Sequence, residues 1–433
     1  MSKKRRVIET LKTVLIVLLT GTALWLVVDS QLFGHLPGVD TDRTEHTESV
    51  STGESVSGRV TLPLAMAVVD REGCCGVQYD RTEVSALFDA LRPLFGEALS
   101  GAGQPRPCTR EEWLQNLSNG TGLWMDLGGS VPMSVLVRWV AGMENPALTA
   151  YTTHLLLHVD GDQAVRLYYQ DTGDGQFYVS EVELVNPALL RSTLEEIPAN
   201  GAAFAGQQPD YAVLQPQMLL AAHLPEPAEY TAVNPLSAPD EQERLETLLE
   251  RLSFPVEITT VYDTPEGRRA RAGNDTLTIS QKGLVSYEST WEEGRYPVET
   301  AGEAGPEFGA VDGARRLVCG LLEPWCGAAG LYVSRVEPLS EDSWRVEFRY
   351  ELDCIPTLVG SEGYAASVLV EQGYITQYDM QLRTFTPAGT QPTPVLAIKQ
   401  AAAIVAQLDD AKGRFGLCYQ DNGGVFRAGW VVE

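Results

Sequence analysis

The sequence predicts an α+β protein in which antiparallel meander sheets carry helices packed on one face, behind a single N-terminal transmembrane helix. Short segments of alternating apolar and polar residues predict the strands, and Asp-Gly pairs at 160–161 and 174–175 predict tight turns between them. Longer segments with apolar residues three and four positions apart predict helices that bury one face. An apolar run directly after a basic cluster predicts the membrane segment.

The predicted membrane segment follows a basic cytoplasmic segment, residues 1–8, which contains KKRR at 3–6. The 19 residues from Thr10 to Val28 would span about 28 Å as a helix, close to the thickness of the hydrocarbon core. We therefore predict a transmembrane signal-anchor over residues 9–33. Basic residues stay on the cytoplasmic side, which predicts a single-pass cell-membrane protein with its N-terminus in the cytoplasm and the bulk of its chain outside.

Four residues of this segment are candidate contacts to a partner in the membrane. Small residues let transmembrane helices approach closely, and an aromatic residue near the outer end would anchor the helix at the interface. The candidates are Thr20, Gly21, Thr22 and Trp25. A cleaved signal peptide is the alternative to a retained anchor, but no clear small-x-small cleavage site follows the apolar run.

Outside the membrane the sequence predicts a stalk and two α+β domains. Residues 34–58 are rich in Thr, Ser and Glu and predict a flexible stalk. A proline-rich stretch at 209–239 places a domain boundary near residue 235. The N-terminal external domain, 59–234, is predicted to contain strands at 59–69, 122–127, 151–158, 163–170 and 176–184, and helices at 81–99, from 109, from 131 and at 186–197.

The C-terminal external domain, 235–433, is predicted to repeat one theme, in which a helix precedes several antiparallel strands. The closing hairpin is formed by strands at 414–419 and 425–432 around a Gly-rich turn. One predicted helix begins at 240, and two more cover 309–322 and 394–408. The remaining predicted strands are at 256–262, 268–271, 276–280, 284–289, 331–337, 343–352, 365–371 and 374–385.

Trp430 is a predicted structural residue of the closing hairpin. It shares a strand face with Phe426, Ala428 and Val432. The simplest packing buries Trp430 between the sheet and a helical stripe formed by Val395, Ile398 and Val405. An exposed Trp430 that anchors a partner is the alternative.

Charge and cysteine content exclude several classes of protein. The formal charge of −26 over 433 residues excludes a nucleic-acid partner, because binding to phosphates needs a positively charged surface. Seven cysteines without a Cys-x-x-Cys pair support neither a thiol-redox motif nor a zinc ribbon. A Cys319–Cys326 bridge and free thiols both remain open.

No group of residues points to catalysis, a metal or a cofactor. His154 and His158 share one strand face, but nothing supplies the further ligands of a zinc site. Asp171-x-x-Asp174-Gly175 lacks the last acidic ligand of a calcium loop and predicts a hairpin turn instead. The chain has no Gly-x-Ser-x-Gly motif and no phosphate-binding glycine loop. We therefore predict that the protein is not an enzyme.

Three stretches of the chain support a family resemblance. They are the opening KKRRVIETLKTVLIVLL, the segment TLTISQKGLVSYES after Asn234-Pro235-Leu236 and a helix ending at Phe254, and the C-terminal LCYQDNGGVFRAGWVVE. Together they resemble the signal-anchor, the central strands and the final hairpin of the YycH/YycI family, the membrane-anchored accessory regulators of the WalK/WalR cell-wall two-component system of Gram-positive bacteria. The length of the chain fits YycH better than YycI.

The resemblance implies a non-catalytic regulator that acts by protein–protein contact through its transmembrane helix and external domains. It implies a sensor histidine kinase as partner, with a paralogous YycI-like protein as a second candidate partner. The direction of regulation differs between lineages and does not carry over. The alternative function is an envelope binding module or hydrolase that acts on wall-derived ligands, which a pocket with converging acids and aromatic residues would favour.

Overall fold

The computed structural model describes residues 63–71, 73–161, 164–223, 225–237, 241–254, 259–290, 294–299, 305–389, 395–407 and 415–432. The predicted cytoplasmic, transmembrane and stalk segments, 1–58, lie outside these residues. In the part of the chain that is described, no helix has the length and hydrophobicity needed to cross a membrane. All described residues belong to one compact unit.

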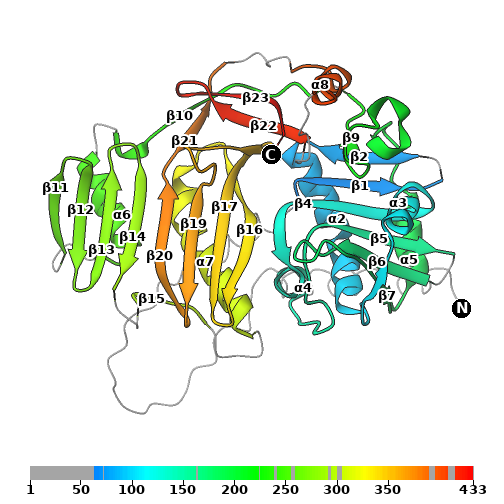
Figure 1. The fold of residues 1–433 in the computed structure, drawn as a ribbon, viewed down its shortest axis with the longest axis horizontal. Coiled ribbons are helices and arrows are strands. Elements are labelled where there is room, and N and C mark those ends of the chain that lie inside the picture. The colour runs from blue at the N-terminus through cyan, green and yellow to red at the C-terminus, as the bar shows by residue number, and fades with distance from the viewer. Residues whose placement is uncertain are drawn as a thin grey trace, which may run out of the picture. The chain divides into compact units, whose positions relative to one another are not determined.

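Seven strands of the N-terminal half form an antiparallel sheet in the order β2-β1-β4-β5-β6-β7-β3 (Figure 1). The sequence predicted neither β2 nor β3, a short strand that contains a proline. The bounds are β1 Ala65–Val69, β2 Cys74–Gln78, β3 Arg106–Cys108, β4 Thr121–Pro132, β5 Tyr151–Asp160, β6 Ala164–Gln170 and β7 Phe177–Val182.

Helices cover both faces of this sheet. On one face, α2 (Arg81–Ser100), α4 (Met133–Ala141) and α5 (Pro187–Glu195) bury apolar side chains in the main core. On the other face, α3 (Arg110–Ser118) packs Trp113 into a second apolar cluster with strand residues. The prediction that helices pack on only one face is therefore wrong for this sheet. The reason is that β4 buries side chains on both faces, which hides the polar-out alternation of a half-exposed strand.

Side chains that accept hydrogen bonds define where three of these helices begin. Asp80 accepts from the Glu83 N–H at 3.0 Å, and Thr109 accepts from the Glu112 N–H at 3.0 Å. Asn186 caps α5 in the same way. These bonds satisfy N–H groups that have no partner within the helix, so the helix starts predicted near 81, 109 and 186 are confirmed.

Eight strands of the C-terminal half form a second antiparallel sheet, in the order β11-β12-β13-β14-β20-β19-β17-β16 (Figure 1). Two helices, α6 (Glu241–Arg251) and α7 (Gly305–Leu322), bury apolar side chains in the same core as these strands. The bounds are β11 Thr260–Thr264, β12 Gly267–Ala272, β13 Asp275–Ser280, β14 Leu284–Ser289, β16 Gly330–Ser340, β17 Ser343–Leu352, β19 Ala366–Glu371 and β20 Tyr374–Gln381, with β15 Tyr296–Pro297 against the start of β20.

Five further strands form a ribbon in the order β21-β10-β23-β22-β18, in which only the contact of β22 with β18 is parallel. The predicted hairpin of β22 and β23 is confirmed. The single strand predicted at 374–385 is instead divided into β20 and β21, because the chain leaves the second sheet and β21 pairs with β10. The bounds are β10 Tyr230–Val233, β18 Ile355–Thr357, β21 Thr384–Pro387, β22 Phe415–Asp421 and β23 Val425–Val432.

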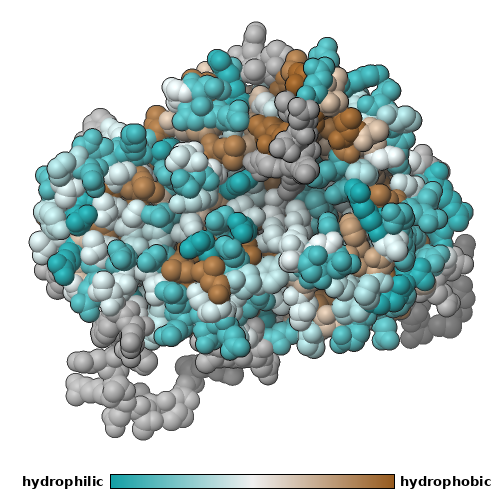
Figure 2. All heavy atoms as spheres, viewed as in Figure 1, coloured by the Kyte–Doolittle hydropathy of each residue, from teal (hydrophilic) through white to brown (hydrophobic). Residues whose placement is uncertain are grey.

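Short elements complete the fold. The helix predicted at 394–408 is described as α8 over Ile398–Val405. The segment between α5 and β10 contains the two-stranded pair β8 (Ala203–Phe204) and β9 (Leu219–Leu220). On the face drawn in Figure 2, hydrophilic residues predominate and apolar residues form separate patches, in keeping with a strongly acidic chain.

Buried polar contacts join the two sheets. A single parallel bridge links Ser130 of β4 to Arg335 of β16. The Trp139 indole of α4 donates to Asp312 of α7 at 2.9 Å, and Asp312 is also paired with Arg315. These contacts lie within one compact unit. The domain boundary predicted near residue 235 stays a prediction.

Candidate functional site

A row of side chains crosses the first sheet on the face opposite α2. Strand register places Gln78, Ala65, Asp126 and His154 directly beside one another on four adjacent strands. Successive residues of a strand point to opposite faces, so these four share one face. Ala65 has a small side chain, which leaves room above the row between the polar groups.

The next row along the same face adds an aromatic residue to this floor. It consists of Gly76, Ala67, Trp124 and Leu156 in register across the same strands. The sheet therefore presents one large indole beside two small residues, Gly76 and Ala67.

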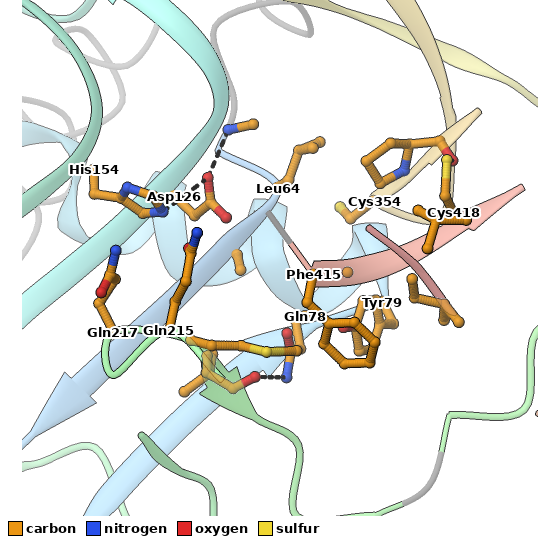
Figure 3. Close-up of a pocket in the computed structure, with 18 of the residues that line it drawn as sticks. Leu64, Gln78, Tyr79, Asp126, His154, Gln215, Gln217, Cys354, Phe415 and Cys418 are labelled. Atoms are coloured by element: carbon orange, nitrogen blue, oxygen red, sulfur yellow. Dashed lines mark hydrogen bonds and ion pairs between the residues drawn. The ribbon is translucent and has the colours of Figure 1, made fainter. Parts of the chain in front are cut away.

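The first row, together with Trp124 of the second row, forms the floor of a pocket of about 90 Å³ that opens between the first sheet and the C-terminal hairpin (Figure 3). Gln215 and Gln217, from the segment between β8 and β9, extend toward Asp126 and His154 in the close-up. Residues 415–418 of β22 form another side of the pocket, together with Cys354 and Pro356. The pocket thus combines parts of the chain that are far apart in sequence.

The polar groups of the floor are unequally satisfied. His154 Nε2 lies 3.7 Å from Asp126 Oδ1, which also accepts from the Gly128 N–H at 2.8 Å. The His154 ring stacks on the Trp124 indole with 5.6 Å between ring centroids. Trp124 is 2% exposed, and its Nε1 has no hydrogen-bond partner among the described residues. A buried N–H group without a partner costs free energy.

A second pocket of about 230 Å³ shares Gln78, Tyr79 and Leu219 with the first. Its other walls include His223, from the segment after β9, and Trp430 of β23. Tyr79 separates the strand β2 from α2 with a φ of 63°, a conformation that non-glycine residues rarely adopt.

Trp430 is half-buried, which is less than the complete burial that the sequence predicted. Its ring stacks on Phe415 at 5.1 Å, and its Nε1 donates to the Leu396 carbonyl at 2.8 Å. It also packs against the cluster that contains Ile398 and Val405 of α8. Trp430 contacts the predicted helix, but the hairpin leaves part of the ring uncovered.

The two histidines of β5 have separate environments. His154 belongs to the pocket, whereas His158 is 6% exposed and its Nε2 lies 2.9 Å from the Asn119 carbonyl oxygen. Burial lowers the pKa of His158 below its usual value. No group of three or more potential metal-ligating side chains occurs among the described residues.

The acidic residues 171 and 174 form a turn, as predicted. Asp171 accepts from the Gly173 N–H at 2.9 Å, and Asp174 accepts from the Gln176 N–H at 2.8 Å. Both bonds are local contacts of the β6–β7 connection.

All seven cysteines are free thiols, so the alternative of a Cys319–Cys326 bridge is not realised. Cys354 is buried at the edge of the pocket, and burial raises its pKa to about 12. A thiol with so high a pKa stays protonated near neutral pH and is a poor nucleophile.

The sequence-predicted partner contacts Thr20, Gly21, Thr22 and Trp25 lie outside the described residues. Conversely, sequence reasoning missed Trp124 and Asp126. The sequence placed both residues in the predicted strand 122–127. Their position beside His154 depends on strand register, which the sequence did not reveal.

The fold of this chain is similar to that of a protein of known structure. No family model and no curated protein matches the chain. The crystal structure of YycH from Bacillus subtilis matches with a TM-score of 0.54 and 12% sequence identity, covering 88% of this chain and 95% of that chain. The chain therefore has a YycH-like fold over most of its length.

Proposed function

We propose that this protein is a membrane-anchored extracytoplasmic regulator of a cell-wall sensor histidine kinase that acts by protein–protein contact. The observation that carries the proposal is the extent of the YycH-like fold, which covers 88% of this chain and 95% of the YycH chain. The three sequence segments that resemble the YycH/YycI family support the same assignment. A paralogous YycI-like protein is the second candidate partner.

The chemistry of the described residues supports contact rather than catalysis. Asp126 is the only acidic side chain among the described residues that line the first pocket, which leaves no second carboxylate for glycoside hydrolysis. The protonated thiol of Cys354 does not supply a nucleophile. These observations favour a regulator over the hydrolase alternative.

Retention of the N-terminal anchor is part of the proposal. The apolar run at 10–28 has the length to span a bilayer, and the basic residues before it favour a cytoplasmic N-terminus. N-terminal sequencing of the protein extracted from membranes should begin at Met1 or Ser2. A start near residue 30 would show that the segment is a cleaved signal peptide and would overturn the anchored form of the proposal.

Co-purification from membranes tests the partner. The full-length protein, extracted in mild detergent, should retain a sensor histidine kinase that mass spectrometry identifies. The control is an unrelated single-pass protein extracted from the same membranes. Equal recovery of the kinase with the control would contradict the proposal.

A further inference from the structure

One end of the second sheet has an uncovered edge. β11 pairs with β12 on one side, in a continuous register over all five of its residues, and pairs with no strand on its other side among the described residues. It is the outermost strand at that end of the sheet (Figure 1). Four of its five residues are exposed, and they include the apolar Val261 and Tyr262. An exposed and regular edge of this kind is a template for pairing with another chain.

The other strands that end a sheet are protected. Beside β2, the Asn200 side chain accepts from the Gly76 N–H at 3.0 Å and donates to the Gly76 carbonyl at 2.8 Å. Beside β21, the Phe385 N–H donates to the Cys326 carbonyl at 3.0 Å. β3 and β18 have three residues each and contain a proline, and β16 bridges to β4. Among the described strands of five or more residues that end a sheet, β11 is the one without such protection.

The backbone groups of β11 alternate between its two sides. A two-residue hairpin that closes at Thr264 and Gly267 joins β11 to β12. Such a hairpin closes on a hydrogen-bonded pair, and hydrogen-bonded pairs alternate along the ladder. The even-numbered residues of β11 therefore bond to β12, whereas the N–H and C=O groups of Val261 and Asp263 point to the free edge. The two-residue hairpin that joins β12 to β13 gives the same alternation.

Arginine side chains lie beside this edge, although the chain as a whole is strongly acidic. β12 contains three arginines in six residues, whereas the formal charge of the chain is −26. Arg268 pairs with Asp263 at 3.4 Å. Arg271 donates from Nε to the Gly273 carbonyl at 3.4 Å, and neither Arg269 nor Arg271 forms an ion pair among the described residues. Two cations next to the free edge therefore lack a counter-charge.

Strand register determines which of these cations can act at the edge. Arg271 lies beside Thr260 and Arg269 lies beside Tyr262, on the face of the sheet opposite to the buried Ala270. The Arg271 side chain is exposed, and Thr260 next to it is small. Arg271 can therefore extend across Thr260 toward a residue of a strand added to the edge.

We propose that the edge of β11 binds an extended acidic segment of a partner protein as an added antiparallel strand, in which a Glu or Asp opposite Thr260 pairs with Arg271. The main chain of the segment bonds to Val261 and Asp263, and the charge-assisted pair selects the acidic side chain. On the other face the segment lies beside Asp263, which repels a further acid there. The segment therefore alternates acidic with apolar residues.

A second copy of this chain fits the edge less well. If β11 paired with β11 of another copy through Val261 and Asp263, the residue opposite Thr260 would be Thr264, which offers Arg271 no counter-charge. An acidic segment supplies that charge. This surface goes beyond the proposed regulatory function and does not depend on a contact with the kinase.

The test uses the full-length protein in detergent and the probe acetyl-Val-Glu-Val-Glu-Val-amide. We expect saturable binding in calorimetry that weakens as salt rises, and slower amide hydrogen exchange at Val261 and Asp263 in the bound state. Arg271→Gln should lower the affinity about tenfold. Arg345→Gln is the matched control, because Arg345 is exposed on β17 of the same sheet and does not border β11.

Val261→Pro tests the addition of a strand, because proline has no N–H and the N–H at this position is not used by β12. We expect the affinity to fall at least about tenfold. Val261→Thr, which retains the N–H, should bind as the wild type does. Circular dichroism shows whether Val261→Pro folds.

Two changes in the probe test the proposal without altering the protein. Acetyl-Val-Lys-Val-Lys-Val-amide and a backbone N-methylated form of the Glu peptide should each bind at least about tenfold more weakly. No binding of the Glu peptide, equal binding of either altered peptide, or equal losses in Arg271→Gln and Arg345→Gln would overturn the proposal. A dimer of the free protein in ultracentrifugation that Val261→Pro dissociates would also overturn it, because a second copy would then occupy the edge.

Discussion

Glu351 of β17, a strand of the second sheet, forms an ion pair with Arg81, the first residue of α2, a helix that packs on the first sheet. The Glu351 side chain is 1% exposed, and it also accepts from the Cys354 N–H at 2.6 Å. The pair joins α2, which packs on the first sheet, to β17 of the second sheet. A buried charge of this kind is costly once it loses its partner.

Replacing Glu351 with Gln should therefore lower the free energy of unfolding by about 3 kcal/mol, because Arg81 loses its counter-charge in a largely buried site. Urea unfolding followed by circular dichroism measures the change. Glu337→Gln is the matched control, since Glu337 pairs with Arg335 at an exposed position and should cost less than about 1 kcal/mol. Equal losses in the two variants would show that the buried pair has no special role.

Trp430→Ala should lower the free energy of unfolding by about 2 kcal/mol, less than the roughly 3–5 kcal/mol of complete burial, because the ring is half-buried. Thermal unfolding measures the effect. Trp430→Phe retains the stacking on Phe415 but loses the hydrogen bond to Leu396, and should cost about 1 kcal/mol. An unchanged melting temperature with lost partner association would instead identify the hairpin as the docking site.

Gly21→Leu should weaken association with the kinase and leave membrane insertion intact, because a larger side chain keeps two helices apart while remaining apolar. Co-purification and carbonate extraction measure the two properties. Gly21→Ala, which keeps a small residue, should behave as the wild type. If an unrelated transmembrane helix of equal length supports the same association, the segment is only an anchor.

Alkaline pH should destabilise the protein through its buried thiols. Burial raises the pKa of Cys74 and of Cys354 from 9.0 to about 12. The unfolded chain releases these protons first, so the stability that they contribute is complete below pH about 9 and is lost as pH rises toward about 12. The double variant Cys74→Ala/Cys354→Ala should show a flatter decline in the urea midpoint over this range. A decline as steep as that of the wild type would assign the effect to other groups.

The hairpin of β22 and β23 and the starts of α2, α3 and α5 were open to prediction because short-range interactions determine them. The Gly-rich turn at 421–424 and the capping residues Asp80, Thr109 and Asn186 act within a few residues of themselves. The resemblance to the YycH/YycI family also came from contiguous segments, and the YycH-like fold agrees with it.

Only the tertiary structure decided which faces of the sheets are buried and which elements of the chain lie side by side. α3 covers the second face of the first sheet because Trp113 packs into one apolar cluster with Trp124 and Tyr168, residues of distant segments whose proximity no local period encodes. The pocket exists because strand register aligns Asp126 with His154 and because β22, almost three hundred residues further along the chain, closes one side. Periodicity determines the elements, but register and long-range packing determine the site, since both depend on contacts whose partners the local sequence does not specify.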